Sequence, residues 1–349
     1  MTDWVKRVLA EIETVEDMVA AFSDEVRCRA LFESLVWPRG RVCPACGFKR
    51  STPIASRLTG KYRARPGLYQ CSSGTCRFQF TATTHTPLHA TKLPLSVWMK
   101  GLWFVLQSDK GVSSPRLAEA LGVSQPTAWR MGHALRRLVG AAEQFEGVVE
   151  ADAFYFGGRN KSDPGGPVLG RGRKGQPRTT KKPALVMVER PESREAGARA
   201  GRAGAEVVQN LSLNEIERVM ERAVDIETTH LMSDEGKGFM SIGQHFVAHD
   251  SVRHSADEFA RGIVHANRAE SFNDRVRRTI TGVFHHISPE HADLYFNEVG
   301  FRWSQRVVAG QTIRRTKKGR ETVQIVWARI PPALQLHAVL RNAVDRAFA

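Results

Sequence analysis

Hydrophobic residues recur at helical spacing in several stretches of the N-terminal half of the chain. Between residues 15 and 36 they lie three or four positions apart, which predicts one or two short helices. The same spacing predicts three further helices, over residues 94–107, 114–121 and 125–139. Between these two helical regions the chain is rich in Gly, Pro, Ser and Thr, which indicates a small module of turns and short strands.

From residue 147 onward, strand-like and helix-like segments alternate. Apolar stretches predict four strands, over residues 148–156, 184–189, 207–211 and 228–233. Helices are expected over residues 214–223, from about Asn267 and from Pro289. Residues 157–182 hold seven glycines and eight basic residues, which is typical of a loop. This alternation indicates an α/β domain.

Length and composition narrow the class of protein. A chain of 349 residues predicts two or three domains, and 42% hydrophobic residues exclude wholesale disorder. The longest apolar runs, such as Leu102–Leu106, fall far below the roughly 18 residues of a bilayer span. The N-terminus lacks the basic-then-apolar pattern of a signal peptide. We therefore expect a cytoplasmic protein that does not enter membranes.

The charge is strongly basic and unevenly distributed. The net charge is +15, and residues 36–80 carry nine basic residues and no acidic residue. Residues 302–320 carry seven basic residues, again without an acid. Such clusters favour a polyanionic partner, either nucleic acid or an anionic membrane face.

All five cysteines lie within the first 76 residues. Cys43 and Cys46 form one C-x2-C pair, and Cys71 and Cys76 form a C-x4-C pair. Two such turns present four thiolates to one tetrahedral zinc ion, and a closed four-cysteine site is structural rather than catalytic. A redox pair is the alternative, but it would not need the second pair of cysteines. Cys28 is expected to be a small buried residue of the preceding helix.

Residues 114–139 have the pattern of a helix-turn-helix. Gly122 falls in the expected turn, Ser124 is suited to cap the second helix, and Pro126 is tolerated in a first turn. In a helix-turn-helix the second helix lies in the DNA major groove. An ordinary helical hairpin is the alternative. The residues expected to contact DNA are Arg130, His133, Arg136 and Arg137.

Three acidic residues occur where metal-ion chemistry is expected. Asp152 lies inside an apolar strand, Asp234 ends a strand, and Glu270 lies in a predicted helix with Asn267 three positions earlier. Carboxylates that converge repel one another unless a divalent cation neutralises them. Two Mg2+ ions about 4 Å apart are a known arrangement for phosphodiester chemistry. A solvated charge or an ion-pair partner is the alternative for any single acid.

Three segments resemble the catalytic motifs of insertion-sequence transposases with an ISXO-like catalytic domain. Residues 149–159 resemble the first motif, residues 233–239 the second, and residues 265–288 the third. Residues 298–303 resemble the closing helix of this family. The four-cysteine ribbon and the helix-turn-helix are similar to its N-terminal region, so the resemblance extends over roughly residues 15–310.

The resemblance implies an RNase H-like domain that cleaves and joins DNA strands, with Asp152 and Asp234 as ligands of two Mg2+ or Mn2+ ions. Family members use either Glu or Asn at the third position. Because a carboxylate is the better ligand for a hard cation, we favour Glu270 as the third catalytic residue and metal ligand. Asn267 is kept as a supporting or substitute catalytic residue.

The chain departs from the family pattern at three positions. Ala153 stands where an acid usually follows the first Asp, and Asn273 stands where an aromatic residue is usual. Arg277 replaces a lysine, which keeps the charge and adds bidentate phosphate binding. Arg277 and Arg278 are therefore expected to contact DNA.

The predicted function is that of a DNA transposase. It would bind the terminal inverted repeats of its element, hydrolyse a phosphodiester at the element end and attack target DNA with the released 3′-hydroxyl. Holding two ends together requires a homodimer or higher oligomer on double-stranded DNA. The alternatives are a non-catalytic DNA-binding regulator and a metal-dependent nuclease that does not join strands.

The expected fold class is an α/β RNase H-like catalytic domain preceded by a four-cysteine zinc ribbon and a helix-turn-helix module. The expected segments are an N-terminal helical segment at 1–36, the ribbon at 37–90, the helix-turn-helix at 91–143, the catalytic domain at 144–310 and a C-terminal extension at 311–349.

Overall fold

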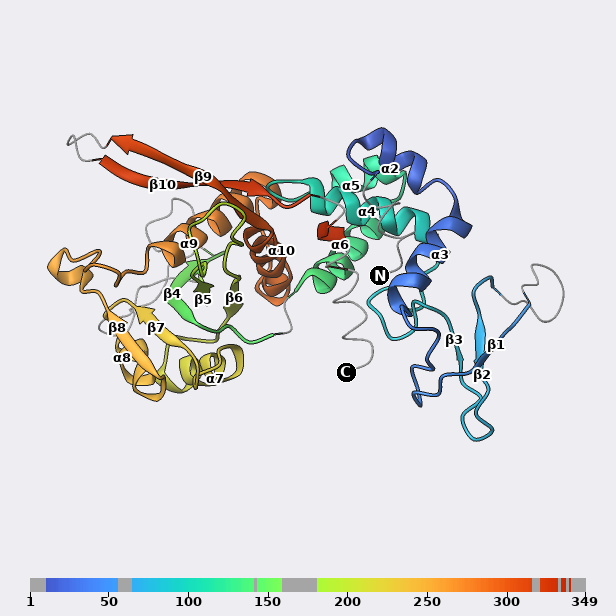
Figure 1. Cartoon of the computed structure of the whole chain (residues 1–349), viewed down its shortest axis with the longest axis horizontal. Helices are drawn as coiled ribbons and strands as arrows, with labels where there is room; N and C mark the ends of the chain where they lie inside the picture. The colour runs from blue at the N-terminus through green and yellow to red at the C-terminus, as the bar shows by residue number, and fades with distance from the viewer. Residues whose placement is uncertain are drawn as a thin grey trace. The chain divides into compact units, whose positions relative to one another are not determined.

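The computed structural model describes residues 11–55, 65–140, 143–158, 181–315, 321–331, 334–336 and 339 (Figure 1). Residues 159–180, most of the predicted glycine-rich loop, lie outside the described residues, as does most of the chain after residue 331. Two compact units make up the chain. Glu143–Arg329 form unit 2, and the residues before and after that range form unit 1.

The described part of unit 1 contains five helices and a small sheet. The helices are α2 (Val15–Ala21), α3 (Glu25–Val36), α4 (Leu95–Gln107), α5 (Ser114–Leu121) and α6 (Gln125–Val139). These bounds confirm the predicted helices. Thr14 and Asp17 form a capping box at the start of α2, and the Asp24 carboxylate caps α3. Glu25 accepts hydrogen bonds from the first backbone N–H groups of α4, which ties α4 to α3.

The small sheet of unit 1 has the antiparallel order β1-β2-β3. Its strands are β1 (Ser51–Pro53), β2 (Tyr69–Cys71) and β3 (Gln79–Phe80). Trp37 packs edge-on against Tyr69 and Phe80, with ring centroids 5.6 and 5.8 Å away. The Tyr69 hydroxyl donates to the Glu33 carboxylate at 2.9 Å, so the ribbon is joined to α3.

Helices α5 and α6 are joined by a short turn. Gly122 ends α5 in the left-handed conformation (φ 64°), which a glycine adopts without strain. Ser124 is the N-cap of α6 as predicted, but its hydroxyl pairs with the Thr127 hydroxyl at 2.8 Å instead of a backbone N–H.

A five-stranded sheet of order β6-β5-β4-β7-β8 forms the centre of unit 2. Its strands are β4 (Val148–Phe156), β5 (Lys182–Glu189), β6 (Ala203–Val207), β7 (His230–Ser233) and β8 (Ala248–Ser251). Strand β5 is antiparallel to β4 and β6, while β7 is parallel to β4 and β8. The expected mixed α/β class is thus confirmed.

Helices cover both faces of this sheet (Figure 1). Alternate residues of β4 point to opposite faces, so Phe154 packs with α9 (Asn267–Thr279) and α10 (Ala292–Ser304), whereas Ala151 packs with α7 (Leu213–Ala223) and α8 (Lys237–Ile242). Short helical turns complete the unit: η1 (Gly243–His245), η2 (His254–Ala256), the π-helical η3 (Ile280–Phe284) and η4 (Pro289–His291).

Strand β6 occupies residues Ala203–Val207 instead of the predicted 207–211. Its small side chains allow α10 to pack closely, since a Cβ on Gly300 would lie 2.2 Å from the Ala203 carbonyl oxygen. Residues 203–207 include alanine and glycine, which have low strand propensity. The pattern of apolar residues therefore predicted the strand in the neighbouring segment, 207–211.

A two-stranded hairpin follows α10. Strands β9 (Arg306–Arg315) and β10 (Glu321–Arg329) pair in antiparallel register, and they span the predicted boundary at residue 310. In the described part of the chain, no helix is long and apolar enough to cross a bilayer.

Candidate functional site

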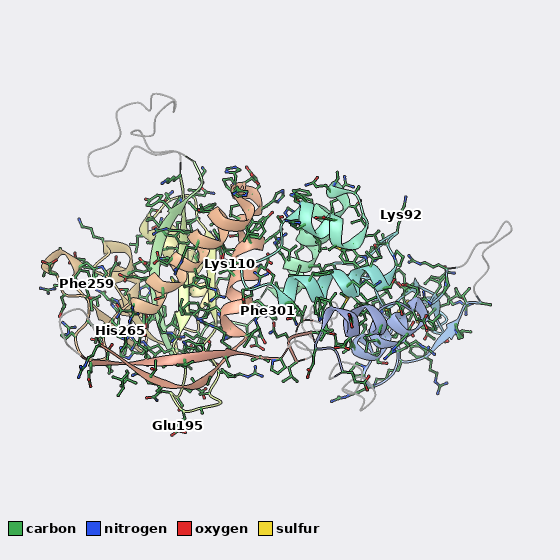
Figure 2. The ribbon with its side chains drawn as sticks, turned by 90° about the horizontal axis from the view of Figure 1, so that it is seen from above. Lys92, Lys110, Glu195, Phe259, His265 and Phe301 are labelled. Atoms are coloured by element: carbon green, nitrogen blue, oxygen red, sulfur yellow. The ribbon has the colours of Figure 1, made fainter. Side chains whose placement is uncertain are left out.

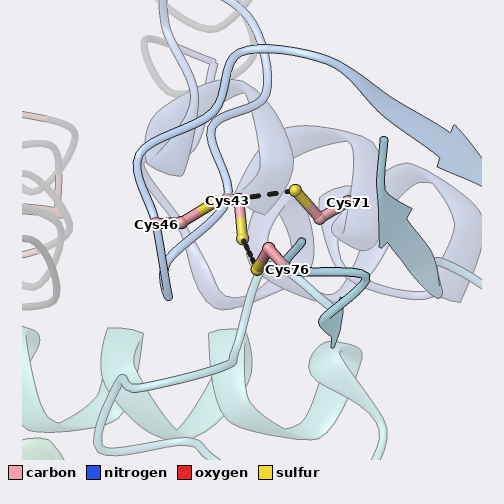
Figure 3. A group of neighbouring side chains, drawn as sticks. All are labelled: Cys43, Cys46, Cys71 and Cys76. Atoms are coloured by element: carbon pink, nitrogen blue, oxygen red, sulfur yellow. Dashed lines mark hydrogen bonds between the residues drawn. The ribbon is translucent and has the colours of Figure 1, made fainter. Parts of the chain in front are cut away.

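The four cysteines of the ribbon meet as predicted (Figure 3). Cys43 Sγ lies 3.9 Å from Cys76 Sγ, and Cys46 Sγ lies 3.6 Å from Cys71 Sγ. A zinc ion with Zn–S bonds of roughly 2.3 Å requires tetrahedral S–S distances of about 3.8 Å, so the cluster fits zinc and is too open for a disulfide. The arrangement supports a structural Zn2+.

The two turns that carry the cysteines are built differently. Gly47 has φ 72° and donates its N–H to the Cys43 carbonyl, as expected of a zinc knuckle. In the second turn a non-glycine residue, Arg77 (φ 50°), takes the left-handed conformation. Cys28 lies outside the cluster and is fully buried in α3, which confirms its predicted structural role. Burial raises the pKa of the Cys28 thiol to about 11.

Asp152 lies on β4, the central strand of unit 2, on the face that α9 covers. Its Oδ1 accepts the Ala153 N–H at 2.7 Å, and its Oδ2 accepts from Asn273 Nδ2 at 2.5 Å. Loss of hydration and the negative charges of Asp234 and Glu270 together raise the pKa of the Asp152 carboxyl to about 6, against the opposing effects of the Ala153 N–H and of Arg277. The three predicted acids therefore share one electrostatic environment.

Strand register explains why Asp234 lies beside Asp152. Val148 pairs with His230 and Glu150 pairs with Met232 in the parallel ladder of β4 and β7. Continuing this register two residues further brings Asp234 level with Asp152. Adjacent strands are about 4.8 Å apart, so the two carboxylates meet at the end of the ladder. The Asp234 Oδ1 also accepts the Gly236 N–H at 2.9 Å, which fixes the turn before α8.

Glu270 lies in the first turn of α9 and is half-exposed. Its Oε1 lies 3.8 Å from His254 Nε2. The position of this helix depends on Glu150, which sequence reasoning did not single out. Glu150 is fully buried, and its Oε2 accepts the backbone N–H groups of Arg268 and Ala269 at 2.7 and 3.3 Å. This carboxylate anchors the N-terminus of α9 to β4.

The other carboxylate oxygen of Glu150 pairs with the guanidinium of Arg190. Arg190 Nε donates to Glu150 Oε1 at 2.6 Å, and Arg190 also donates to the Ile263 and His265 carbonyls. The pKa of Glu150 is lowered despite burial, since His265 and Arg190 stabilise the carboxylate. The alternation of β4 places Glu150 and Asp152 on one face, and that spacing was a usable sequence signal.

Glu150→Ala is expected to destabilise the protein by about 3–5 kcal/mol, because Arg190 and the α9 N-terminus would lose their buried counter-charge. Urea unfolding measures this loss. Glu215→Ala on α7 removes a carboxylate that pairs with the exposed Arg218, and it should change stability little. Equal effects of the two substitutions would contradict the anchoring role of Glu150.

Asn267 and Asn273 occupy different positions relative to the acids. Asn267 is exposed at the first residue of α9, and its carbonyl accepts the Ser271 hydroxyl. Asn273, one of the departures from the family pattern, is buried and bonds Asp152 directly. Its Oδ1 is buried without a hydrogen-bond partner among the described residues. The amide contact of Asp152 therefore comes from Asn273, which lies three residues past Glu270 on the same helix face.

The two arginines predicted to contact DNA from α9 are both exposed. Arg277 lies 5.7 Å from the Phe154 ring centroid, and its charge lowers the pKa of Asp152, so it lies beside the acids. Arg278 Nε donates to the Asp274 carbonyl at 3.2 Å.

The predicted DNA-contacting residues of α6 divide into two pairs. Arg130 and Arg137 are exposed, whereas His133 and Arg136 are 7% and 4% exposed. The His133 ring stacks on Trp129 at 4.1 Å.

The distances between their ligand atoms distinguish the three predicted acids from a site that binds a single metal ion. Within the described residues, two groups have ligand atoms within 4.8 Å of one another: the four cysteines, and the largely exposed Glu217, Glu221 and His245. Asp152, Asp234 and Glu270 are spread more widely. The three acids therefore do not form a compact site for a single ion in this structure.

In the metal-free protein, the raised pKa of Asp152 predicts stability that falls with rising pH. Its ordinary pKa is 3.8 and its folded value is about 6. Between these values the folded state holds a proton that the unfolded state has lost, so raising the pH lowers the free energy of unfolding, by up to ~3 kcal/mol. Urea unfolding across this window without divalent cations should show the slope, and Asp152→Asn should remove it. The same slope in both proteins would contradict the assignment.

Comparison with known families agrees with this geometry. The model of the ISXO2-like transposase domain matches residues 144–304, and that of the transposase zinc-ribbon domain matches residues 23–79. No curated protein matches the chain. The first segment contains the three acids and the second contains the four cysteines. The chain therefore belongs to the IS1595 family of transposases.

Proposed function

We propose that this transposase cleaves duplex DNA at its element ends and joins the released strands to target DNA. The observation that carries the proposal is that the charges of Asp234 and Glu270 both act on Asp152, which lies on the central strand of unit 2. The sheet order, with β5 as the single strand antiparallel to its neighbours, supports an RNase H-like fold for this unit.

The three carboxylates would hold two Mg2+ or Mn2+ ions. Their oxygens are the ligands that these hard cations prefer, and the raised pKa of Asp152 reflects negative charge that a cation would neutralise. When bound, the ions supply Lewis-acid stabilisation of the charge that develops on the phosphodiester. We assign the third ligand to Glu270 instead of Asn267, whose side chain makes no contact with Asp152 in the described structure.

The other residues of the site would orient the acids and the DNA. Asn273 holds Asp152 Oδ2 through its amide N–H, so it fixes the rotation of that carboxylate. Arg277 is exposed beside the acids, where its guanidinium would bind a phosphate. Arg278, one residue on, would contact the neighbouring backbone.

Unit 1 would bind the terminal inverted repeats. Helices α5 and α6 support a helix-turn-helix in which Arg130 and Arg137 of α6 contact DNA. A basic pocket of ≈ 730 Å³ beside the ribbon includes Arg41, Lys49 and Arg50, which suits a phosphate backbone. Because two element ends must be held together, we expect a dimer or higher oligomer on DNA.

A strand-transfer assay tests this function. Duplex DNA from either side of the coding sequence is incubated with the protein, Mg2+ and a target plasmid. Cleavage followed by joining is the expected result. Cleavage without joining would make the protein a nuclease, and tight binding without cleavage would make it a regulator; either result overturns the proposal.

A further inference from the structure

The hairpin of β9 and β10 lies beyond the segment that the transposase family matches, which ends at residue 304. The first residues of β9, Arg306 to Val308, form the root of the hairpin and are hydrogen-bonded to a preceding loop of unit 2. Val308 exchanges backbone hydrogen bonds with Gly197 and Ala198, and Arg306 accepts one from Ala200. Figure 2 shows Glu195 on the loop that runs beside this root. The hairpin is therefore a fixed arm of the catalytic unit.

The distal part of the arm is exposed on both faces. All residues from Gln311 to Arg315 are exposed, and so are Glu321 to Gln324 on the opposite strand. Ile313 and Val323 are direct cross-strand partners and are 67% and 58% exposed. A two-stranded ribbon without a packed face is marginal in water, so these residues are suited to a partner that covers them.

The charge of the arm identifies the partner. Residues 306–329 contain seven basic residues and a single acid, Glu321, which pairs with Arg315 at 3.0 Å. Arg314 and Arg315 are neighbours in β9, so they point to opposite faces of the ribbon. The ribbon therefore carries a guanidinium on each face; Glu321 offsets that of Arg315, and the remaining net positive charge is complementary to the phosphates beside a groove.

Two further arginines lie at the root of the arm. Arg268 and Arg306 both lie against Trp303 of α10 and Trp327 of β10, at 4.1 to 5.6 Å from the ring centroids. Arg268 Nε and Nη2 and Arg306 Nη2 are buried without a hydrogen-bond partner among the described residues. Burial and the charges of Arg275 and Arg268 lower the pKa of Arg306 to about 9. A phosphate backbone along the root would offset this repulsion.

We propose that the β9–β10 hairpin is a DNA-binding arm that lies in the major groove of the duplex held by unit 2. The inference rests on the proposed DNA function of the chain. The major groove is wide enough for a two-stranded ribbon, and exposed apolar side chains such as Ile313 and Val323 suit contact with thymine methyl groups. Arg314 and Arg315 would contact the flanking phosphates.

DNA fits this surface better than a second copy of the chain. Two copies of the arm would bring their basic residues against each other, with only Glu321 of each to compensate. The exposed arginines of β9 also oppose edge-to-edge pairing of strands.

The test compares Arg314→Gln/Arg315→Gln with wild type for binding to a random-sequence duplex across a range of salt concentrations. The variant should bind about tenfold more weakly, and the slope of log K against log salt should decrease in magnitude by about 2. A matched control, Arg218→Gln/Arg222→Gln, removes the same charge from exposed positions on α7. It should leave both quantities near wild type.

Guanine N7 faces the major groove, so protection of N7 from methylation shows where the arm contacts the duplex. Wild type should protect guanines that the hairpin variant leaves reactive. If wild type binds DNA but the variant shows the same slope and protection, the arm proposal is wrong while the DNA function stands. If the variant changes only the oligomeric state, the arm is a protein interface and the proposal is also wrong. Failure of wild type itself to bind DNA would overturn the proposed function.

Discussion

Asp234→Asn is expected to reduce metal-dependent DNA cleavage by about three orders of magnitude or more. The substitution removes a charged ligand from the proposed metal centre, and such charge stabilisation is worth several kcal/mol in the transition state. The asparagine oxygen can still accept the Gly236 N–H that Asp234 accepts now, so the turn before α8 should persist. Cleavage is measured on labelled duplex with Mg2+, and DNA binding is measured separately.

Asp250→Asn provides a matched control for this prediction. Asp250 lies on the adjacent strand β8 and pairs with His230 at 2.9 Å, outside the group of three acids. It should retain nearly full cleavage. The metal-site role of Asp234 would be contradicted if Asp234→Asn cleaved at the wild-type rate, or if it lost DNA binding while its fold stayed intact.

Cys71→Ser is expected to abolish zinc binding and unfold the ribbon while unit 2 remains folded. Structural zinc sites contribute about 10–16 kcal/mol in isolated zinc-finger peptides, which is comparable to the whole stability of a domain. The ribbon sheet is very small, and β3 has only two residues. Zinc content per chain and amide hydrogen exchange in β2 measure the effect.

The fifth cysteine gives this experiment its control. Cys28 is as buried as Cys71 but lies outside the four-cysteine cluster. Cys28→Ser should therefore keep one zinc per chain and slow exchange in β2. A Cys71→Ser protein with full zinc content and unchanged exchange would refute the four-cysteine site.

Strong local patterns made much of the secondary structure predictable. The helices α5 and α6 and the strand β4 have the predicted bounds, because each combines clear periodicity with turn residues at its ends. Strand β8 was not predicted, since Ala248–Ser251 is short, polar and only half-buried at the sheet edge. It forms because its backbone completes the ladder with β7.

The residues of the candidate site could be predicted from the sequence where they lie in recognisable motifs. The three acids were singled out by their strand and helix contexts and by the family resemblance, and the register of β4 and β7 now accounts for Asp152 and Asp234 lying side by side. The roles of Glu150 and Asn273 depend on how α9 packs on β4. Such long-range contacts are set by tertiary structure, and a local sequence pattern does not reveal them.

The hairpin illustrates a different limit. Its basic residues were evident in the sequence. The pairing of β9 with β10 depends on a register that joins Ile313 to Val323 across the turn. The composition of this segment did not show that the two strands belong to unit 2 and follow directly after α10.

The most direct test of the account is to locate Mn2+ in crystals of the protein bound to DNA, using anomalous scattering. We predict two Mn2+ ions about 4 Å apart, held by Asp152, Asp234 and Glu270. The same crystals of Asp234→Asn should lose at least one of them. Mn2+ bound only at Glu217, Glu221 and His245, or no Mn2+ at the three acids, would contradict the proposed catalytic centre.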